Sequence, residues 1–155
     1  MRRRLRVFVL WAAAVAAAAA GAASCVSPAA QGRGGGRVEE KMFVTTAHCA
    51  CGKCCGWERN SDGVPVYSSG THKGEPKQVG RTASGTIAKH GTVAADPKYP
   101  FGTVVHVPGY GYGRVEDRGS GVRGDHLDLF FSDHDRAIQW GRQWKKVKVW
   151  LPEKP

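Results

Sequence analysis

The sequence predicts a mainly β fold, a small barrel with one short helix, and three observations favour it. Runs of β-branched and aromatic residues recur along the chain, glycine-rich turns separate them, and one stretch has both ends of a helix marked. Short strands with glycine-rich bends are typical of small barrels. The domain is expected to span residues 41–155, an ordinary size for a single hydrophobic core.

The expected strands are short and separated by turns. In chain order they cover residues 42–48, 85–88, 92–95, 103–108, 109–117, 126–131 and 144–151. In the last of them Val147, Val149 and Leu151 alternate with polar or bulky residues, so that one face is apolar.

The single expected helix covers residues 133–140. Ser132 is the predicted N-cap, with Asp135 three residues later as in an acidic capping box. Gly141 is the predicted C-terminal stop. Residues 58–78 are polar and rich in turn formers, so we expect a surface loop there.

The N-terminus has the layout of an export signal. Arginines precede an apolar, alanine-rich run over residues 7–23, which is short and weakly apolar for a membrane-spanning helix, the alternative interpretation. Small residues lead to Cys25, which predicts a lipoprotein signal peptide over residues 1–25 with lipidation of Cys25; simple cleavage nearby remains an alternative. Residues 26–40 are rich in Gly, Pro and charge, which predicts a flexible linker.

The charge favours an anionic polymer as partner. Removal of residues 1–25 takes away four arginines and no acidic residue, which lowers the formal net charge from +10 to +6. Such a charge suits cell wall, nucleic acid or a lipid surface. Export argues against nucleic acid, and no basic stripe interleaved with aromatic residues is present.

One carboxylate stands in a setting where burial is expected. Asp128 lies between Leu127 and Leu129, and burial raises a carboxyl pKa by favouring the neutral form. A neutral carboxylic acid suits general acid catalysis. His126 lies two residues earlier, on the same face of the strand. A structural aspartate that accepts backbone N–H groups remains the alternative.

The sequence resembles the 3D domain, a family named for three aspartates. The resemblance rests on "TASGT" (82–86), "GTVAADPKYPFGTVVHVPGYGYGRVEDRGSGVRGDHLDLFF" (91–131) and "AIQWGRQWKKVKVW" (137–150). It implies a six-stranded double-psi β-barrel, shared with membrane-bound lytic transglycosylase A and expansins.

The resemblance also implies an activity, cleavage of peptidoglycan glycan strands to 1,6-anhydro ends without a cofactor. In these terms Asp128 is the catalytic acid and Asp117, on a neighbouring strand, supports it electrostatically. Asp96 and His126 are supporting residues, although Asp96 before Pro97 can also cap a turn. The expected substrate-binding residues are Thr82, Ser84, Tyr110 and Tyr112. The family usually carries Asn-Arg where this chain has Asp125-His126.

Four cysteines lie close together in "HCACGKCCGW" (48–57). In an exported protein oxidation is the default, so Cys49, Cys51, Cys54 and Cys55 are candidates for two short-range disulfides. A metal site that includes His48 and free thiols remain alternatives, but no metal is assigned because a distant second pair of ligands is missing.

The leading hypothesis is therefore an exported, lipid-anchored, monomeric lytic transglycosylase of the cell envelope that acts on peptidoglycan and binds no nucleic acid. Three rival hypotheses remain. They are an expansin-like module that binds wall glycan without cutting it, a wall hydrolase with Asp117 as base, and a metal-binding surface protein.

Overall fold

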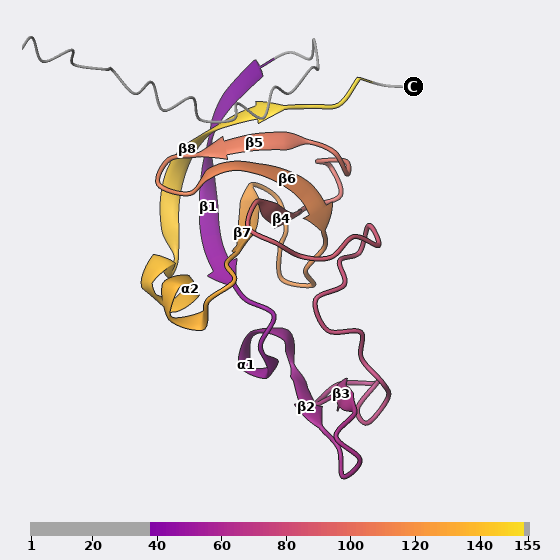
Figure 1. Cartoon of the computed structure of the whole chain (residues 1–155). Coiled ribbons are helices and arrows are strands. Elements are labelled where there is room, and N and C mark those ends of the chain that lie inside the picture. Colours follow the sequence, from indigo (N-terminus) through magenta and orange to yellow (C-terminus); the bar gives the residue numbers. More distant parts are fainter. Residues whose placement is uncertain (1–37, 154–155) are drawn as a thin grey trace, which may run out of the picture.

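The computed structural model describes residues 38–153, and these residues fold around a closed six-stranded barrel (Figure 1). The strands neighbour one another in the order β1-β7-β4-β6-β5-β8. They are β1 (Val38–His48), β4 (Thr92–Ala95), β5 (Val104–Val107), β6 (Gly111–Asp117), β7 (His126–Phe130) and β8 (Gln143–Trp150).

Two of the barrel's strand pairs are parallel, β1 with β7 and β4 with β6, and the other pairs are antiparallel. The predicted fold class, a mainly β protein built on a six-stranded barrel, is confirmed. The parallel pairing of β1 with β7 brings the carboxyl ends of two strands, far apart in sequence, to one edge of the barrel.

The alternation of side chains along each strand fills the barrel. Leu127 and Leu129 of β7 are fully buried, as are Val147 of β8 and Phe43 of β1. Gly113 of β6 allows the strands to approach closely, because a Cβ built there would lie 2.5 Å from a methyl carbon of Val93. In β7, Leu127 and Leu129 are thus committed to the core, and only the other face of this strand is free to carry chemistry, whereas all four residues of β4 are buried.

Helix α2 (His134–Trp140) is the predicted helix, with its N-cap one residue later than expected. Asp133, not Ser132, is the N-cap, and its carboxylate accepts a hydrogen bond of 2.9 Å from the backbone N–H of Arg136. Gly141 ends the helix with a positive φ of 61°, as predicted.

A small arm extends away from the barrel between β1 and β4 (Figure 1). It contains helix α1 (Gly52–Cys55) and the antiparallel pair β2 (Trp57–Arg59) and β3 (Pro65–Tyr67). The prediction of a single helix therefore misses α1, and the expected surface excursion over 58–78 contains a two-stranded pair that was not predicted. These elements are too short to show a periodic apolar pattern, and Val66 is the one buried residue in their strands.

Two further boundaries differ from the prediction. Residues 85–88 form no strand; the segment contributes only an isolated bridge between Arg81 and Ile87. Residues 38–40 of the predicted linker belong to β1, where Val38 pairs with Trp150 of β8. The predicted signal peptide, Cys25 and the remainder of the linker lie outside the described residues.

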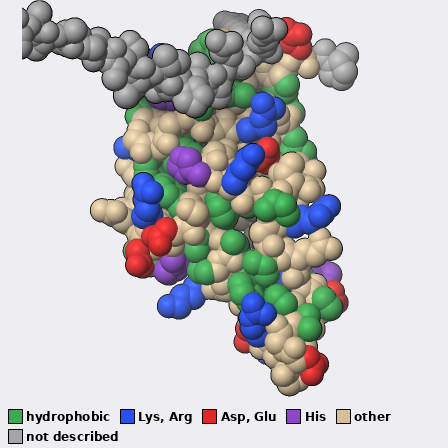
Figure 2. Space-filling view, viewed as in Figure 1, with side chains coloured by type: hydrophobic (Ala, Val, Ile, Leu, Met, Phe, Trp, Pro, Cys, Tyr) green, Lys and Arg blue, Asp and Glu red, His purple; other side chains and the backbone are tan. Residues whose placement is uncertain are grey.

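None of the helices within residues 38–153 is long and apolar enough to cross a membrane. On the face shown in Figure 2, lysine and arginine side chains are scattered among other residues and form no single continuous patch.

Candidate functional site

Asp128 lies on the outer face of β7, between two residues that fill the core. Its register partners are Thr46 on β1 and Ala94 on β4. Its side chain is 22% exposed, so the carboxylate is partly desolvated but still reachable from a cleft. The position predicted from the apolar flanks of Asp128 is therefore correct.

A polar network surrounds this carboxylate. The Thr46 hydroxyl donates to Asp128 Oδ1 over 2.6 Å and lies 2.9 Å from His126 Nε2. Because a hydroxyl has one hydrogen, the donor to Thr46 is then the Nε2–H of His126. His126 thus reaches Asp128 through Thr46, and this geometry makes it a supporting group rather than a direct partner.

His48 contacts the other carboxylate oxygen. Its Nδ1 lies 3.0 Å from Asp128 Oδ2, within ion-pair distance. The contact is an ion-pair contact rather than a well-directed hydrogen bond, because the N–H of the ring does not point at the oxygen. His48 thus lies beside Asp128 as a partner for the charged form of the carboxylate.

The network sets the pKa of Asp128. Burial pushes the pKa up, but contacts with His48, the Thr46 hydroxyl and the nearby His126 outweigh it, so the pKa lies below its ordinary value. The expectation of a raised pKa is therefore wrong, because the buried carboxylate lies next to His48 and Thr46, which favour its charged form.

Asp117 opens onto the same cleft as Asp128 but does not lie on an adjacent strand. Ala94 of β4 pairs with both aspartates, so β4 runs between them. Two strand spacings place their backbones roughly 9–10 Å apart. The carboxylate of Asp117 accepts a hydrogen bond of 2.8 Å from the backbone N–H of Ala83.

The cleft has a volume of about 400 Å³ and a polar lining. Besides the two aspartates, Lys77, Arg81 and Arg118 contribute positive charge to it. It is formed by the end of β1, the arm and the loop after β6, and it combines acids with cations in a space large enough for a sugar unit.

Asp96 has a structural role. It accepts hydrogen bonds from the backbone N–H groups of Lys98 and Gly124, at 2.9 and 2.7 Å, and so ties its own turn to the loop before β7. These donors lower the pKa of Asp96. Asp125 lies outside the cleft lining and forms ion pairs with Lys41 and Lys98.

The expected substrate-binding residues do not gather in the cleft. Thr82 is buried and closes a turn with Thr86, while Ser84 lies in the same turn, next to the backbone group that binds Asp117. Tyr110 is buried, and its hydroxyl donates to the carbonyl of Phe130, so it belongs to the core.

Tyr112 is 55% exposed, but it packs against His106 and Trp150 on another face of the barrel. Neither Tyr110 nor Tyr112 lines the cleft, so the expectation that they stack on bound sugars stays a prediction without support from the cleft.

The cysteines form a cluster without a disulfide bond. All four described cysteines are free, and the sulfurs of Cys49 and Cys54 are 3.8 Å apart. Cys55 points elsewhere and donates to the carbonyl of Cys49. Burial raises the pKa of the Cys49 thiol, whereas a backbone N–H of Cys54 lowers that of Cys51 to about 7.

The sequence did not indicate three residues that make contacts here. Thr46 and His48 contact Asp128, and Nδ1 of His134 lies within 3.6 Å of the sulfurs of the cysteine cluster. Thr46 looks like an ordinary strand former, His48 was considered only as a metal ligand, and His134 was not considered. A useful signal for His48 and Thr46 is the alternation of β1, which places them on the same face, two residues apart.

Fold and site together define a small closed β-barrel protein with a pair of aspartates in a basic cleft. The chain contains a 3D domain, since residues 91–152 match the family model described as "3D domain". The matched range includes Asp96, Asp117 and Asp128. The resemblance noted from the sequence is confirmed.

Two relatives come from Bacillus subtilis (strain 168). The chain is 39% identical over 75 residues, 45% of this chain and 18% of the relative, to the protein called "Putative cell wall shaping protein YabE". It is 36% identical over 58 residues, 37% of this chain and 20% of the relative, to the "Cell wall-binding protein YocH". The chain thus spans about a fifth of the length of these curated relatives.

Proposed function

We propose that this protein acts on the bacterial cell wall as a peptidoglycan lytic transglycosylase, with Asp128 as the acid that cleaves the glycan strand. The observation that carries the proposal is the placement of Asp128. Its side chain is 22% exposed, opens onto the cleft and lies 3.0 Å from Nδ1 of His48. The names of the two relatives support a wall substrate.

In the proposed reaction one carboxyl group acts twice. Protonated Asp128 gives its proton to the glycosidic oxygen as the bond from that oxygen to the anomeric carbon of N-acetylmuramic acid breaks. The carboxylate then takes the proton of the sugar's own 6-hydroxyl, whose oxygen bonds to the anomeric carbon. The products are a free hydroxyl end and a 1,6-anhydro end, with no water consumed and the acid regenerated.

The lowered pKa of Asp128 shapes this cycle. In the resting protein the carboxylate is charged at neutral pH, held by His48 and Thr46. Entry of a sugar excludes water from the cleft, which favours the neutral, proton-carrying form. We propose that Asp117 supports this step from across β4. Asp96, through the loop before β7, and His126, through Thr46 of β1, help to hold β7 in place.

The proposed location follows from the N-terminus and the substrate. An exported chain held at the cell envelope by a lipid on Cys25 meets peptidoglycan directly. A single barrel with its own cleft acts as a monomer on this polymer, and the positive formal charge suits an anionic wall.

A second candidate is wall binding without cleavage. It is favoured by the low pKa of Asp128, because a permanently charged carboxylate binds polar groups but donates no proton. A hydrolase is the third candidate. It is favoured by the presence of two aspartates, Asp117 and Asp128, in the lining of one cleft, since inverting hydrolases use a pair of carboxyl groups.

The test is a digest of purified peptidoglycan by the full chain, with products read by mass spectrometry. Asp128→Asn is compared with Asp62→Asn, an exposed aspartate in the arm. We expect products one water lighter than hydrolysed muropeptides from the parent and from Asp62→Asn, and none from Asp128→Asn. Reducing-end products would mean hydrolysis, and wall sedimentation without products from any variant would establish binding alone.

A further inference from the structure

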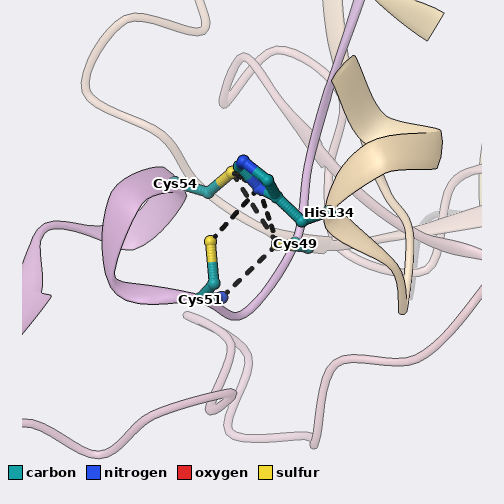
Figure 3. A group of neighbouring side chains, drawn as sticks. All are labelled: Cys49, Cys51, Cys54 and His134. Atoms are coloured by element: carbon teal, nitrogen blue, oxygen red, sulfur yellow. Dashed lines mark hydrogen bonds between the residues drawn. The ribbon is translucent and has the colours of Figure 1, made fainter. Parts of the chain in front are cut away.

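Four potential metal ligands meet at the edge of the barrel where β1 and β7 end. The sulfurs of Cys49, Cys51 and Cys54 and a ring nitrogen of His134 all lie within 4.8 Å of one another. Figure 3 shows the four side chains converging on a common point, three from the segment after β1 and one from the start of α2.

The distances match the edges of a tetrahedron around a zinc ion. With Zn–S of about 2.3 Å and Zn–N of about 2.0–2.1 Å, ideal tetrahedral angles place two sulfurs about 3.8 Å apart and a sulfur and nitrogen about 3.5 Å apart. The Cys49 and Cys54 sulfurs are 3.8 Å apart. The three sulfurs lie 3.6, 3.3 and 3.5 Å from His134 Nδ1.

The same distances do not describe a disulfide. A disulfide requires about 2.05 Å between sulfurs. It would also leave the histidine without a role, although Nδ1 of His134 contacts all three sulfurs. A histidine nitrogen 3.3–3.6 Å from three sulfurs, with all four atoms within 4.8 Å of one another, fits a shared central ion better than any pairwise bond.

The fold explains how ligands 80 or more residues apart come together. Because β1 and β7 are parallel, His48 and Phe130 end side by side, and the backbone N–H of Phe131 bonds to the carbonyl of His48 over 2.8 Å. The chain after β1 supplies the cysteines, and the chain after β7 supplies His134 as the first residue of α2. Topology thus provides the distant ligand that the sequence pattern lacked.

We propose that Cys49, Cys51, Cys54 and His134 bind one zinc ion, through three thiolates and Nδ1. Four protein ligands leave no open coordination position, so the ion has a structural role. The backbone N–H of Cys51 points at the Cys49 sulfur over 3.5 Å, an outer-shell contact of the kind that orients thiolate ligands. The exposed side chain of Cys54 leaves a path for the metal to enter.

The ion would fix the wall of the candidate cleft. Cys54 lines that cleft, and Cys49 directly follows His48, the residue in contact with Asp128. Zinc would therefore join the arm, the end of β1 and the start of α2 at one point. This role is independent of whether the cleft cuts, hydrolyses or only binds glycan.

The test measures metal content directly. The full chain carrying Cys25→Ser, so that its only cysteines are the four described, is purified under reducing conditions, loaded with Zn²⁺ and dialysed. We expect one zinc per chain, a thermal midpoint raised by zinc, and loss of both effects in Cys51→Ser and His134→Ala. The control Cys55→Ser, which alters a sulfur outside the cluster, should retain the metal.

A second variant separates ligation from folding. His134→Cys replaces the nitrogen by another thiolate and should restore one zinc per chain, which a merely structural requirement for His134 does not predict. The proposal is overturned if the folded parent retains no zinc, if it isolates with a Cys49–Cys54 disulfide that persists instead of metal binding, or if Cys55→Ser loses zinc as completely as Cys51→Ser.

Discussion

Replacement of Thr46 by valine should raise the pKa of Asp128. The two side chains have nearly the same shape, so the change removes one hydroxyl, which donates over 2.6 Å to the carboxylate. That hydrogen bond favours the charged form and contributes to the lowered pKa. The histidines and the cations of the cleft remain in place.

The magnitude follows from the strength of such a bond. A hydrogen bond to a charged group contributes about 1.5–3 kcal/mol. One pKa unit corresponds to about 1.4 kcal/mol, which gives a range of about 1–2 units. A neutral carboxyl group retains part of the contact with a hydroxyl, so we expect a rise of about one unit in the pKa of Asp128.

The assay follows the carboxyl carbon of Asp128 by NMR as a function of pH, with Asp128→Asn identifying the signal. In the proposed reaction the same change should increase the rate of glycan cleavage about tenfold at a pH well above the pKa, because the protonated fraction rises about tenfold. Thr71→Val, at an exposed loop position, is the control. An Asp128 signal that titrates at the same pH in Thr46→Val and in the parent would refute this reasoning.

Three further predictions concern the barrel. Gly113→Ala should lower the free energy of unfolding, measured in urea titrations, by about 1–2 kcal/mol, because the new Cβ would lie 2.5 Å from a methyl carbon of Val93. The control Gly121→Ala, at a position with open space around it, should change the free energy of unfolding by less than about 0.5 kcal/mol. Tyr110→Phe should cost about 1–3 kcal/mol, because its hydroxyl accepts from the partly buried N–H of Gly91 and donates to the buried carbonyl of Phe130. Wall sedimentation should be unchanged; weaker sedimentation of the folded variant would support a binding role. The pKa of Asp96 is lowered in the folded state, so Asp96 stabilises the fold above the unfolded-state pKa of about 3.9, and this stabilisation is lost as the pH falls through the folded-state pKa. Asp96→Asn should therefore make the free energy of unfolding less steeply dependent on pH in acid. Equal steepness in the parent and the variant would contradict this.

The sequence predicted the parts of the fold that repeat a simple pattern. Val147 and Val149 alternate with lysines and lie in the core, and the apolar flanks of Asp128 correctly marked a partly buried acid. The arm was missed because its strands have three residues each and show no period. Leu151, expected on the apolar face, follows the end of β8 and is 43% exposed.

The residues around Asp128 and those of the cysteine cluster are brought together by the pairing of strands far apart in the sequence, which a local sequence pattern does not reveal. Nothing near Asp128 in the sequence indicates that Thr46 and His48, about 80 residues earlier, set its pKa. The sign of that shift was predicted wrongly for this reason, since local flanks report burial but not partners. His134 was missed as a member of the cysteine cluster because only the parallel pairing of β1 and β7 brings it there.

The closure of the barrel by its first and last strands has a consequence for how the chain folds. β1 pairs along its length with β8, from Val38 with Trp150 to Thr45 with Gln143, and otherwise with β7. Contacts that join such distant residues must be formed against a large loss of chain entropy, which slows folding. During synthesis β1 therefore has neither of its native barrel neighbours until β7 and β8 have been made.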